Sequence, residues 1–568
     1  MESLEFSDYV AYWLKLFPEL DSASELEEVL KRVSGTRLAD LHEKLEASGN
    51  LVDSFVPQLL TTPTMPILVI LGPKIKMRLP YYYFFEPILN LALSRYYHRL
   101  MNMLILAGDL AFWENTLIQL ALSLYQVAER TIILEINVAR IEDQLKGATP
   151  QERFIYFTDV VLRDKDYLTA LYGEYTVLTE LMRTKADNYL SFLLEILENT
   201  QAELDSITQG LNNGTPFGKV CSIITGMGDT HCGGKTVSVI SFDSGSKIVY
   251  KPRHTVVEEK FQLLLQWKMD RAKELLGDKI LKIHSGNGCG WIEYVDYKES
   301  ENADEVERFY IRIGQLMCIL YALNARDFHH ENILAFGEYP ILLDLESIFH
   351  SNQGLNSNDT CSALSMANCI LERSVYSIGL LPQTISNPTD SYSDKSIDVS
   401  GLGGEDVQIS PFQGMQVVDD NTDTIRMETQ YGSIMPKSNA PKMHGFVQRS
   451  EWHIEGIKRG FTNMYRWLRC NKNELISLLH ALFAGQHNRY ILRPTFLYAQ
   501  LLSTSYHPDF MRDPISRNVL LHRLGIGESG DNSEVLACEL HDLRAGEVPF
   551  FNIVIDSTKL LDSRGACI

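Results

Sequence analysis

The chain has 568 residues, of which 45% are hydrophobic and 22% are charged, and it carries a net charge of −21. Such a length allows about three to five domains or one large composite body, and the apolar content excludes a chain that is disordered throughout. The acidic balance excludes a generic nucleic-acid binder, because phosphate backbones are bound by clustered positive charge.

Residues 1–210 are expected to form a helical N-terminal region. Apolar residues recur at helical spacing in residues 114–141 and 187–207, the pattern of helices that pack on one face. A packed scaffold explains this pattern better than a cofactor-binding box. The first residues lack a basic stretch followed by a long apolar run, so they do not predict a signal peptide. No apolar stretch approaches the roughly 18 residues of a membrane span.

Residues 211–350 are expected to form a core of strands and helices with a kinase-like order. TVSVISF and KIVY predict a β-hairpin turned by DSGS, and a second hairpin is expected in residues 280–295. The helix between the hairpins covers residues 256–276. A further helix in residues 304–324 places apolar side chains on one face.

Residues 351–450 and 451–568 differ in composition and in hydrophobic pattern. Residues 351–450 are rich in Ser, Asn, Asp, Thr and Gly, and the part from Ser386 to Gly432 has the least regular pattern. Long irregular loops are often functional lids, so this segment is expected to be an activation-like or lid-like insertion. Helical patterning returns in residues 451–568, which are expected to form a C-terminal helical region that completes the phosphate site.

The nine cysteines form no CxxC pair and no even spacing. Their pattern predicts a reduced, cytoplasmic protein without a disulfide framework. The adjacent His231 and Cys232 stand alone, so no structural zinc site is expected. We expect no direct membrane insertion and no nucleic-acid partner.

The strongest chemical signal lies in residues 325–346. Asp327, His329 and Asn332 form D-x-H-x-x-N after a helix, and Asp344 follows the apolar strand PILL. A kinase needs an Asp near the attacking hydroxyl, and an Asn and a second Asp that hold Mg²⁺ on the ATP phosphates. This order resembles phosphoinositide lipid kinases more than the H-R-D order of protein kinases. A chance polar loop is the alternative.

A lysine upstream strengthens the kinase hypothesis. Lys251 ends the strand KIVYK, after a Gly-rich hairpin. A lone strand lysine is usually a solvated charge, but this one precedes the catalytic loop, as the ATP-phosphate lysine of kinases does. Glu258 and Glu259, early in the next helix, are weak candidates for its partner.

Two further segments carry candidate phosphate-handling residues. In GMGDTHCGGK, Gly226 and Gly228 would let backbone amides approach phosphate. Asp229 and His231 are unexpected there, because Asp repels phosphate, and they suggest acid–base or orienting groups. In NRYILRPTFLY, Arg489 can grip phosphate bidentately, although an isolated arginine is more often a surface residue. Thr495 is a candidate donor to the phosphoryl oxygens.

Taken together, these segments resemble the dehydratase part of the class II lanthipeptide synthetases, the LanM type. The matching segments are, in chain order, GDTHCGGK, VYKPR, RDFHHENILAFGEYPILLDLE, SVYSIGLLP, DVSGLGG, NRYILRPT and GEVPFF. The resemblance implies an α+β, largely helical fold with a lipid-kinase-like, two-lobed core and added helical regions at both ends. Glu346 stands where many kinases have Gly in D-F-G, which separates DLE from ordinary kinases.

The resemblance also implies a two-step reaction on a ribosomal precursor peptide that carries a leader segment. ATP with Mg²⁺ phosphorylates a Ser or Thr, and phosphate is then eliminated, with ADP as the nucleotide, to give dehydroalanine or dehydrobutyrine. The implied phosphorylation residues are Lys251, Asp327, His329, Asn332, Asp344 and Glu346, and the implied elimination residues are Asp229, His231, Arg489 and Thr495.

The chemistry explains why two sets of residues are needed. Hydroxide is a poor leaving group because water has a pKa of about 15.7, whereas phosphate monoesters ionise near a pKa of about 6. The departing phosphate still needs a cation such as Arg489 or an acid such as a protonated His231. A base must take the Cα proton, and Asp229, His231 and Asp327 are the candidates.

Full-length relatives continue into a zinc cyclase domain, whereas this chain ends at GACI without such a Cys/His constellation. We therefore expect no thioether formation by this chain, and a separate cyclase or an export transporter is a candidate partner. The alternatives are a peptide kinase that stops at the phosphorylated product and a catalytically silent peptide-binding scaffold. A tRNA-dependent dehydratase is disfavoured by the acidic balance.

Overall fold

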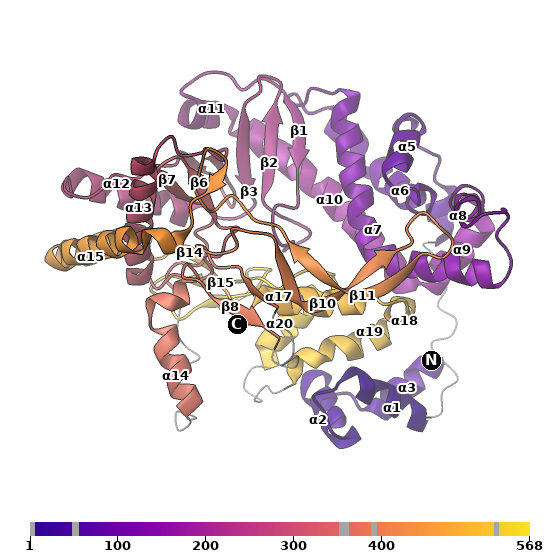
Figure 1. Ribbon diagram of the computed structural model, residues 1–568. Coiled ribbons are helices and arrows are strands. Elements are labelled where there is room, and N and C mark those ends of the chain that lie inside the picture. The colour runs from indigo at the N-terminus through magenta and orange to yellow at the C-terminus, as the bar shows by residue number, and fades with distance from the viewer. Residues whose placement is uncertain (1–5, 48–55, 351–362, 388–394, 527–532) are drawn as a thin grey trace.

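The computed structural model describes residues 6–47, 56–350, 363–387, 395–526 and 533–568 (Figure 1). Helices make up about 53% of the chain, and the sheets are small and antiparallel. This composition confirms the α+β, largely helical class.

The largest apolar core joins a helical body to the main sheet. Its helix side chains and the sheet residues Tyr250 and Trp291 belong to one buried cluster. The indole of Trp291 also donates to the hydroxyl of Thr200 at 3.0 Å. The helices of this body are α4 (Val56–Thr61), α5 (Pro66–Arg78), α6 (Tyr82–Met101), α7 (Leu110–Ile141), α8 (Pro150–Asp159), η1 (Val161–Arg163), α9 (Lys165–Glu174), α10 (Thr176–Ala202) and α11 (Leu204–Asn212).

One of these helices, α7, is long and apolar enough to cross a membrane by length and composition alone. Half of its most apolar window is buried inside the protein, and it contacts α5, α6, α10 and the first strand of the sheet. This is the environment of a core helix. The sequence expectation overlooked it because isolated polar residues such as Gln119 and Gln126 interrupt the apolar ones.

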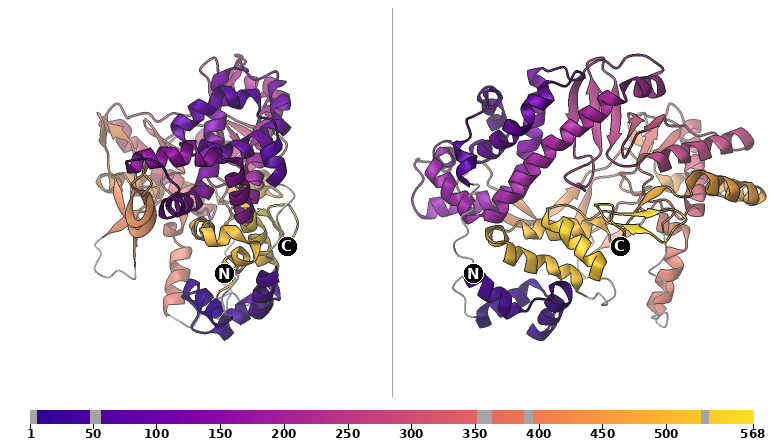
Figure 2. Two further views of the ribbon diagram at one scale, coloured as in Figure 1. Left: turned by 90° about the vertical axis from the view of Figure 1, so that its right-hand side faces the viewer. Right: turned by 180° about the vertical axis from the view of Figure 1, so that it is seen from behind.

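The first three helices pack against the C-terminal helices rather than on the main helical body. Trp13 stacks on Phe510 with ring centroids 6.0 Å apart, and both belong to one buried cluster. Figure 2 shows the indigo N-terminal helices directly below the yellow C-terminal helices in both views. The elements are α1 (Phe6–Leu16), α2 (Ala23–Ser34), α3 (Leu38–Ala47), α17 (Thr495–Ser505), α18 (Pro508–Arg512), α19 (Pro514–Leu521), η5 (His522–Gly525) and α20 (Ser533–Arg544).

This C-terminal core contains a histidine without a hydrogen-bond partner. His522 is 3% exposed, and neither ring nitrogen has a partner in the described part of the chain. Burial, aided by the charge of Arg544, lowers its pKa from 6.5 to about 4. In the unfolded chain His522 binds a proton below about pH 6.5, whereas in the folded chain it binds one only below about pH 4. The free energy of unfolding therefore falls as the pH falls from 6.5 to 4.

His522→Leu should therefore reduce acid sensitivity. At about 1.36 kcal/mol per pH unit, the wild-type protein should lose about 2 kcal/mol of unfolding free energy to this residue between pH 6.5 and pH 5. Urea unfolding of both proteins at pH 7 and pH 5 measures the difference, because their other titrating groups are the same. An equal loss in both proteins would contradict the prediction.

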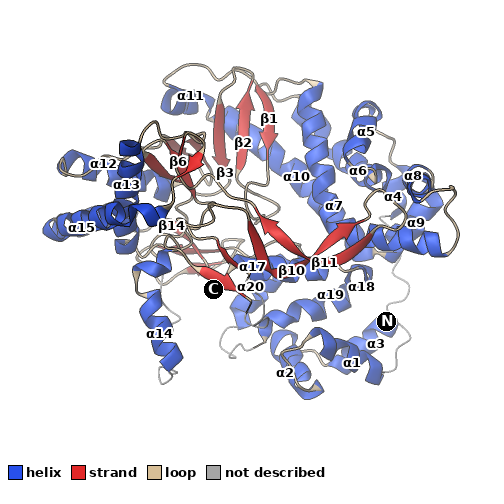
Figure 3. Cartoon of the chain, in the orientation of Figure 1, coloured by secondary structure: helices blue, strands red, loops and turns tan. Residues whose placement is uncertain are grey.

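The main sheet has five antiparallel strands in the order β1-β2-β3-β5-β4 (Figure 3). Both expected hairpins are confirmed, since β2 pairs with β3 and β4 with β5. The helix α12 (Val256–Arg271) connects the two hairpins, and it ends five residues earlier than expected. The strands are β1 (Val220–Ile224), β2 (Ser238–Phe242), β3 (Lys247–Lys251), β4 (Ile283–Ser285) and β5 (Gly290–Glu293).

A second apolar core surrounds α13 (Ala303–Ala322), which carries the expected apolar face. It packs against α15 (Ile454–Cys470), and α16 (Lys472–Phe483) follows. The two backbones touch at glycines: a Cβ on Gly314 would lie 2.0 Å from the carbonyl oxygen of Ile457. A Cβ on Gly460 would lie equally close to the carbonyl oxygen of Ile311.

Gly314→Ala should separate α13 from α15 and lower the unfolding free energy by about 2 kcal/mol or more, the usual cost of an overpacked core. Gly173→Ala, in α9, is the matched control, because a Cβ there meets no atom within 4 Å. The control should be neutral or slightly stabilising, since Ala is the better helix former. Denaturant unfolding of the two variants checks both expectations.

The segment expected to be least regular contains the longest strands. β10 (Gln408–Val418) and β11 (Arg426–Ile434) pair over most of their length, so the expectation for Ser386–Gly432 was wrong, apart from residues 388–394, which lie outside the described residues. The turn of this ribbon is held from far away in sequence, because Arg153 pairs with the fully buried Asp423 at 2.5 Å. Such a contact leaves no local pattern.

The remaining elements surround the second core and the chain end. Two of the strand pairs, β6–β7 and β14–β15, carry residues discussed below. These elements are β6 (Ile333–Phe336), β7 (Tyr339–Leu342), α14 (Ala363–Glu372), η3 (Val375–Ile378), β8 (Thr384–Ser386), β9 (Ser396–Asp398), β12 (Lys442–Met443), β13 (Phe446–Val447), η4 (Ser450–His453), β14 (His487–Tyr490), β15 (Phe551–Val554) and β16 (Leu560–Leu561).

Candidate active site

The predicted lysine ends a strand and is buried in an ion pair. Lys251 is the last residue of β3, and its Nζ lies 3.0 Å from Oε1 of Glu258, in the first turn of α12. Both side chains are only 3% exposed. The same Nζ donates to the carbonyl of Leu343 at 2.8 Å. Of the two carboxylates considered as partners, Glu258 is therefore the one in contact.

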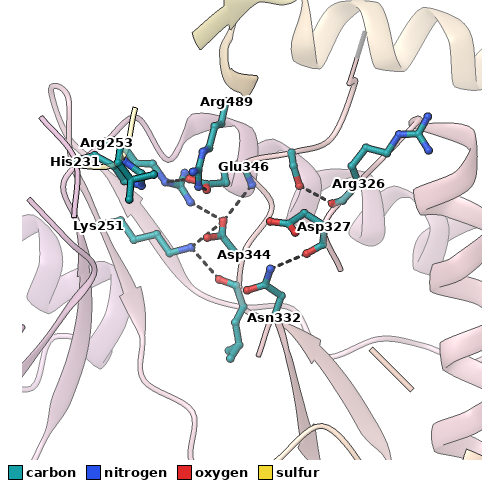
Figure 4. A network of polar contacts seen from close by, with 12 residues as sticks. His231, Lys251, Arg253, Arg326, Asp327, Asn332, Asp344, Glu346 and Arg489 are labelled. Atoms are coloured by element: carbon teal, nitrogen blue, oxygen red, sulfur yellow. Dashed lines mark hydrogen bonds and ion pairs between the residues drawn. The ribbon is translucent and has the colours of Figure 1, made fainter. Parts of the chain in front are cut away.

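Arg253 ties three carboxylates together, and sequence reasoning did not single it out. Its Nη2 lies 2.8 Å from Oε1 of Glu258 and 2.7 Å from Oδ1 of Asp344. Its Nε lies 2.8 Å from Oε2 of Glu346. Figure 4 shows Arg253 and Lys251 approaching Asp344 from the same side. Its position in VYKPR could have predicted this role. Arg253 follows Lys251 by two residues, and alternate residues of an extended chain face the same side.

The two predicted metal ligands lie at the same end of one hairpin. β6 pairs with β7, and the amide of Leu343 donates to the carbonyl of Asn332 at 2.9 Å. Asp344 follows directly, so the hairpin places Asn332 and Asp344 at its same end. Burial raises the pKa of Asp344, but Lys251 and Arg253 outweigh it and lower the pKa to about 2. The carboxylate is therefore ionised at neutral pH.

The donor set fits a hard cation. Every contact of Asp344 within the described residues goes through Oδ1, which leaves Oδ2 available. The side-chain NH₂ of Asn332 donates to the main-chain carbonyl of Asp327 at 2.7 Å, which turns its amide oxygen away from that bond. Carboxylate and amide oxygens are the ligands that Mg²⁺ takes in proteins, with phosphate oxygens completing the set.

Asp327 sits on a strained turn in the loop after α13. Its φ is 65°, a left-handed conformation that is costly for a residue with a side chain and is typical of functional sites. Neighbouring amides hold the turn: Phe328 donates to Ile378 at 2.9 Å, and His330 donates to Val399 at 3.0 Å. Burial raises the pKa of Asp327 to about 7; the charge of Arg489 opposes this rise, and the charges of Glu346 and Asp344 add to it.

His329 lies on the same loop, with its backbone bridged to Ser400. Its Nδ1 accepts the amide of Glu331 at 3.3 Å. Burial lowers the pKa of His329. The ring is therefore held as part of the loop rather than in an ion pair.

Arg489 reaches the same cluster from β14. Its backbone amide donates to the carbonyl of Glu346 at 2.9 Å, and its guanidinium forms an ion pair with Oε1 of the same residue. Glu346 therefore lies between two arginines, Arg489 and Arg253. Burial opposes the charge of Arg489, but Glu346 outweighs it and the pKa of Arg489 is raised.

The Gly-rich loop between β1 and β2 docks on a segment more than 300 residues away. The Nδ1 atom of His231 lies 2.7 Å from the carbonyl oxygen of Val548, and the amide of Val548 donates to Thr230 at 3.2 Å. Gly233 donates to the carboxylate of Glu547 at 2.7 Å. The segments GDTHCGGK and GEVPFF thus form one structural unit, although nothing in either sequence predicts the contact.

Phe550 brings His231 and Arg489 together. The His231 ring centroid lies 5.1 Å from that of Phe550, and the guanidinium of Arg489 lies 5.3 Å from the same ring. Burial lowers the pKa of His231 to about 4, and the charge of Arg489 acts in the same direction. The imidazole is therefore neutral at neutral pH.

The other predicted residues are not hydrogen-bonded to the cluster in the part of the chain that the structure describes. Gly226 and Gly228 take positive φ values of 77° and 138°, with open space where a Cβ would be. Asp229 is exposed beside them, and its charge reaches His231 and Asp327. Thr495 begins α17, and no hydrogen bond joins it to the cluster within the described residues.

Comparison with known proteins gives two matches that bear on these residues. Residues 175–554 match a family described as "Domain of unknown function (DUF4135)". The chain is also 24% identical over 460 residues to the "Lacticin 481/lactococcin biosynthesis protein LcnDR2" of Lactococcus lactis subsp. lactis. That match covers 78% of this chain and 47% of the relative, so the chain spans about half the length of the curated relative it matches.

Proposed function

Because the chain belongs to the DUF4135 family, whose matched residues include the whole charged cluster, we propose that it is a lanthipeptide dehydratase of the LanM type. The relative named for lacticin 481 and lactococcin biosynthesis supports a role in lanthipeptide modification. The proposed substrate is a ribosomal precursor peptide with a leader segment, and a separate cyclase or an export transporter is a candidate partner. The cytoplasm remains the expected location.

The proposed reaction has two balanced steps. In the first, the Ser or Thr oxygen bonds to the γ-phosphorus of ATP, the bond to the ADP oxygen breaks, and the hydroxyl proton passes to a base. In the second, a base removes the Cα proton, the Cβ–O bond breaks, and phosphate leaves as the Cα=Cβ bond forms. Each cycle converts one residue to its dehydro form and ATP to ADP and phosphate.

The first step, phosphorylation, is assigned to the residues around Lys251. When bound, Mg·ATP supplies the phosphoryl group and the cation that shields its charge. Lys251, oriented by Glu258, is placed to contact phosphate oxygens, and Asn332 and Asp344 are placed to hold the cation. Asp327 is placed to hold the hydroxyl proton. A lipid-kinase-like, two-lobed core is part of this proposal.

The second step is assigned to Arg489 and His231. With the ring neutral, the contact of Nδ1 with the carbonyl of Val548 requires the proton on Nδ1, because a carbonyl oxygen only accepts. Nε2 is then an acceptor, so His231 is suited to take a proton rather than to give one. Arg489 remains as the cation for the departing phosphate. Asp229 and Asp327 stay as alternative bases, and Thr495 as a candidate phosphate donor.

One observation carries the proposal: a continuous set of ion pairs links the two halves. Lys251 contacts Glu258, Arg253 contacts Glu258, Asp344 and Glu346, and Arg489 contacts Glu346. The cations suited to transferring a phosphoryl group and to expelling it thus share one site. A kinase that stops at the phosphorylated product would have no use for the second cation next to His231.

Mass spectrometry of a candidate precursor peptide incubated with the protein, ATP and Mg²⁺ tests the proposal. Loss of the mass of one water per modified Ser or Thr is the expected result. Gain of a phosphoryl group alone would favour the peptide kinase. No change in mass, together with no thermal stabilisation by Mg·ATP, would favour the silent scaffold, because a ligand of the native state raises its stability.

A further inference from the structure

A separate cavity lies outside the charged cluster. A cavity of about 770 Å³ opens between α13, α15, the turn after η3 and residues 398–408. The residues of the charged cluster do not line it, namely Lys251, Arg253, Glu258, Asp344, Glu346 and Arg489. Its volume lies within the range of about 300–1,000 Å³ that is usual for ligand pockets.

The floor of the cavity is apolar and comes from two motifs that the proposed chemistry does not use. Leu381 belongs to SVYSIGLLP, and Leu402 belongs to DVSGLGG. Met317 of α13 and Phe461 of α15 complete the floor. Such a surface accepts an aliphatic or aromatic side chain without a hydrogen-bonding requirement.

The mouth of the cavity carries more negative than positive charge. Glu405, Asp406 and Glu451 surround Arg449, which pairs with Asp406 and lies 3.9 and 3.8 Å from the other two. Burial raises the pKa of Glu405; the amide of Ser450 and the charge of Arg449 oppose this rise, and the charges of Glu451 and Asp406 add to it. Lys458 also lines the mouth, but it pairs outward with Glu455 at 2.9 Å. The rim therefore favours a cation.

Backbone hydrogen bonds join the wall of the cavity to the loop that carries Asp327. His330 bonds Val399 through both its amide and its Nδ1 atom, at 3.0 and 2.8 Å. The next residue, Ser400, bridges His329, and Leu402 of the cavity floor follows two residues later. A molecule held in the cavity thus lies beside the loop that carries Asp327.

We propose that this cavity binds the substrate peptide, taking an apolar side chain in its floor and an adjacent lysine or arginine at its acidic rim. The bound peptide then presents a neighbouring Ser or Thr to Asp327. The inference rests on the proposed function, because it takes the occupant to be the peptide that is modified. A peptide fits better than a small metabolite, since the wall of the cavity is hydrogen-bonded to the loop that carries Asp327 and an extended chain can contact both.

Binding of labelled peptides, measured by fluorescence anisotropy without nucleotide, tests the inference. Three short peptides contain one serine each and differ in the two residues beside it: one has Leu-Lys, one Leu-Glu and one Asn-Lys. The wild-type protein should bind the Leu-Lys peptide at least about tenfold more tightly than either of the others, since charge complementarity and apolar burial both contribute. Equal affinity for the three peptides would overturn the proposal.

Charge reversal at the acidic rim provides a second test of the inference. Asp406 and Glu451 are 63% and 66% exposed, so D406K/E451K should fold normally. This variant should bind the Leu-Lys peptide about tenfold more weakly and the Leu-Glu peptide more tightly. Glu301→Lys is the matched control, because Glu301 is 66% exposed and neither it nor its partner Lys298 lines the cavity. If D406K/E451K and the control behave alike, the rim does not recognise the peptide.

The outcome separates the two proposals. Rim-dependent binding without any phosphorylation or dehydration would keep the peptide site and reject the dehydratase. Dehydration with rim-independent binding would keep the dehydratase and reject the peptide site.

Discussion

Replacing Asp344 with alanine is expected to lower phosphoryl transfer to a serine peptide by about 100- to 1,000-fold, the usual cost of removing a preorganised charge from a reacting centre, and to stop dehydration with it. Asp344 is ionised, and its Oδ2 is available for a cation at the end of the β6–β7 hairpin. Its loss also leaves Lys251 and Arg253 with fewer anionic partners. Mass spectrometry of the peptide after a fixed reaction time measures the effect.

Glu338→Ala is the matched control for Asp344→Ala. Glu338 lies in the turn at the opposite end of the same hairpin and pairs with Arg308 and Arg312 at 2.5 and 2.8 Å. Its removal breaks ion pairs of similar burial but leaves the charged cluster intact. The control should keep most of the activity. Normal phosphorylation by Asp344→Ala, or an equal loss in both variants, would reject the metal-ligand assignment.

Much of the site could be predicted from local sequence patterns, because its short strands are indicated by the spacing and alternation of nearby residues. The spacing of Asp327, Asn332 and Asp344 required a hairpin between the two metal ligands, and β6–β7 supplies it. The alternation in KIVYK predicted a strand that ends at Lys251. These features depend on neighbours within about twenty residues, where periodicity and turn residues are informative.

Long-range contacts account for what could not be predicted. Arg253 has its three carboxylates on an adjacent helix and a distant loop. His231 finds its acceptor at Val548. The β10–β11 ribbon is held by Arg153 through Asp423. Apart from Glu258, which lies five residues after Arg253, each of these partners lies too far along the chain for a periodic pattern to reveal it, so only the folded chain identifies the pair.

The arrangement of Glu346 suggests how one site can serve two steps. Its two carboxylate oxygens are divided between Arg253 and Arg489. A phosphate bound between these arginines would compete with Glu346 for both, and its departure would restore the ion pairs. The same two cations can then receive a phosphoryl group and release a phosphate without any large rearrangement of the backbone.

Arg489→Ala should therefore leave phosphorylated peptide behind. The variant loses the cation beside His231 that neutralises the departing phosphate, and such a loss costs about 100- to 1,000-fold. Lys251, Asn332 and Asp344 are untouched, and Glu346 keeps Arg253 as its partner. Phosphorylation should continue and provides an internal check that the variant is folded and binds ATP.

Two measurements make this prediction decisive. Mass spectrometry should show peptide that has gained a phosphoryl group but has not lost water, and a synthetic phosphoserine peptide offered with ADP should be converted by the wild-type protein but not by Arg489→Ala. Arg489→Lys should restore part of the elimination, since it keeps the charge but cannot bond Glu346 or phosphate through two nitrogens. Dehydration at the native rate by Arg489→Ala would show that the departing phosphate is neutralised by another group, and Arg253 would then be the first to replace.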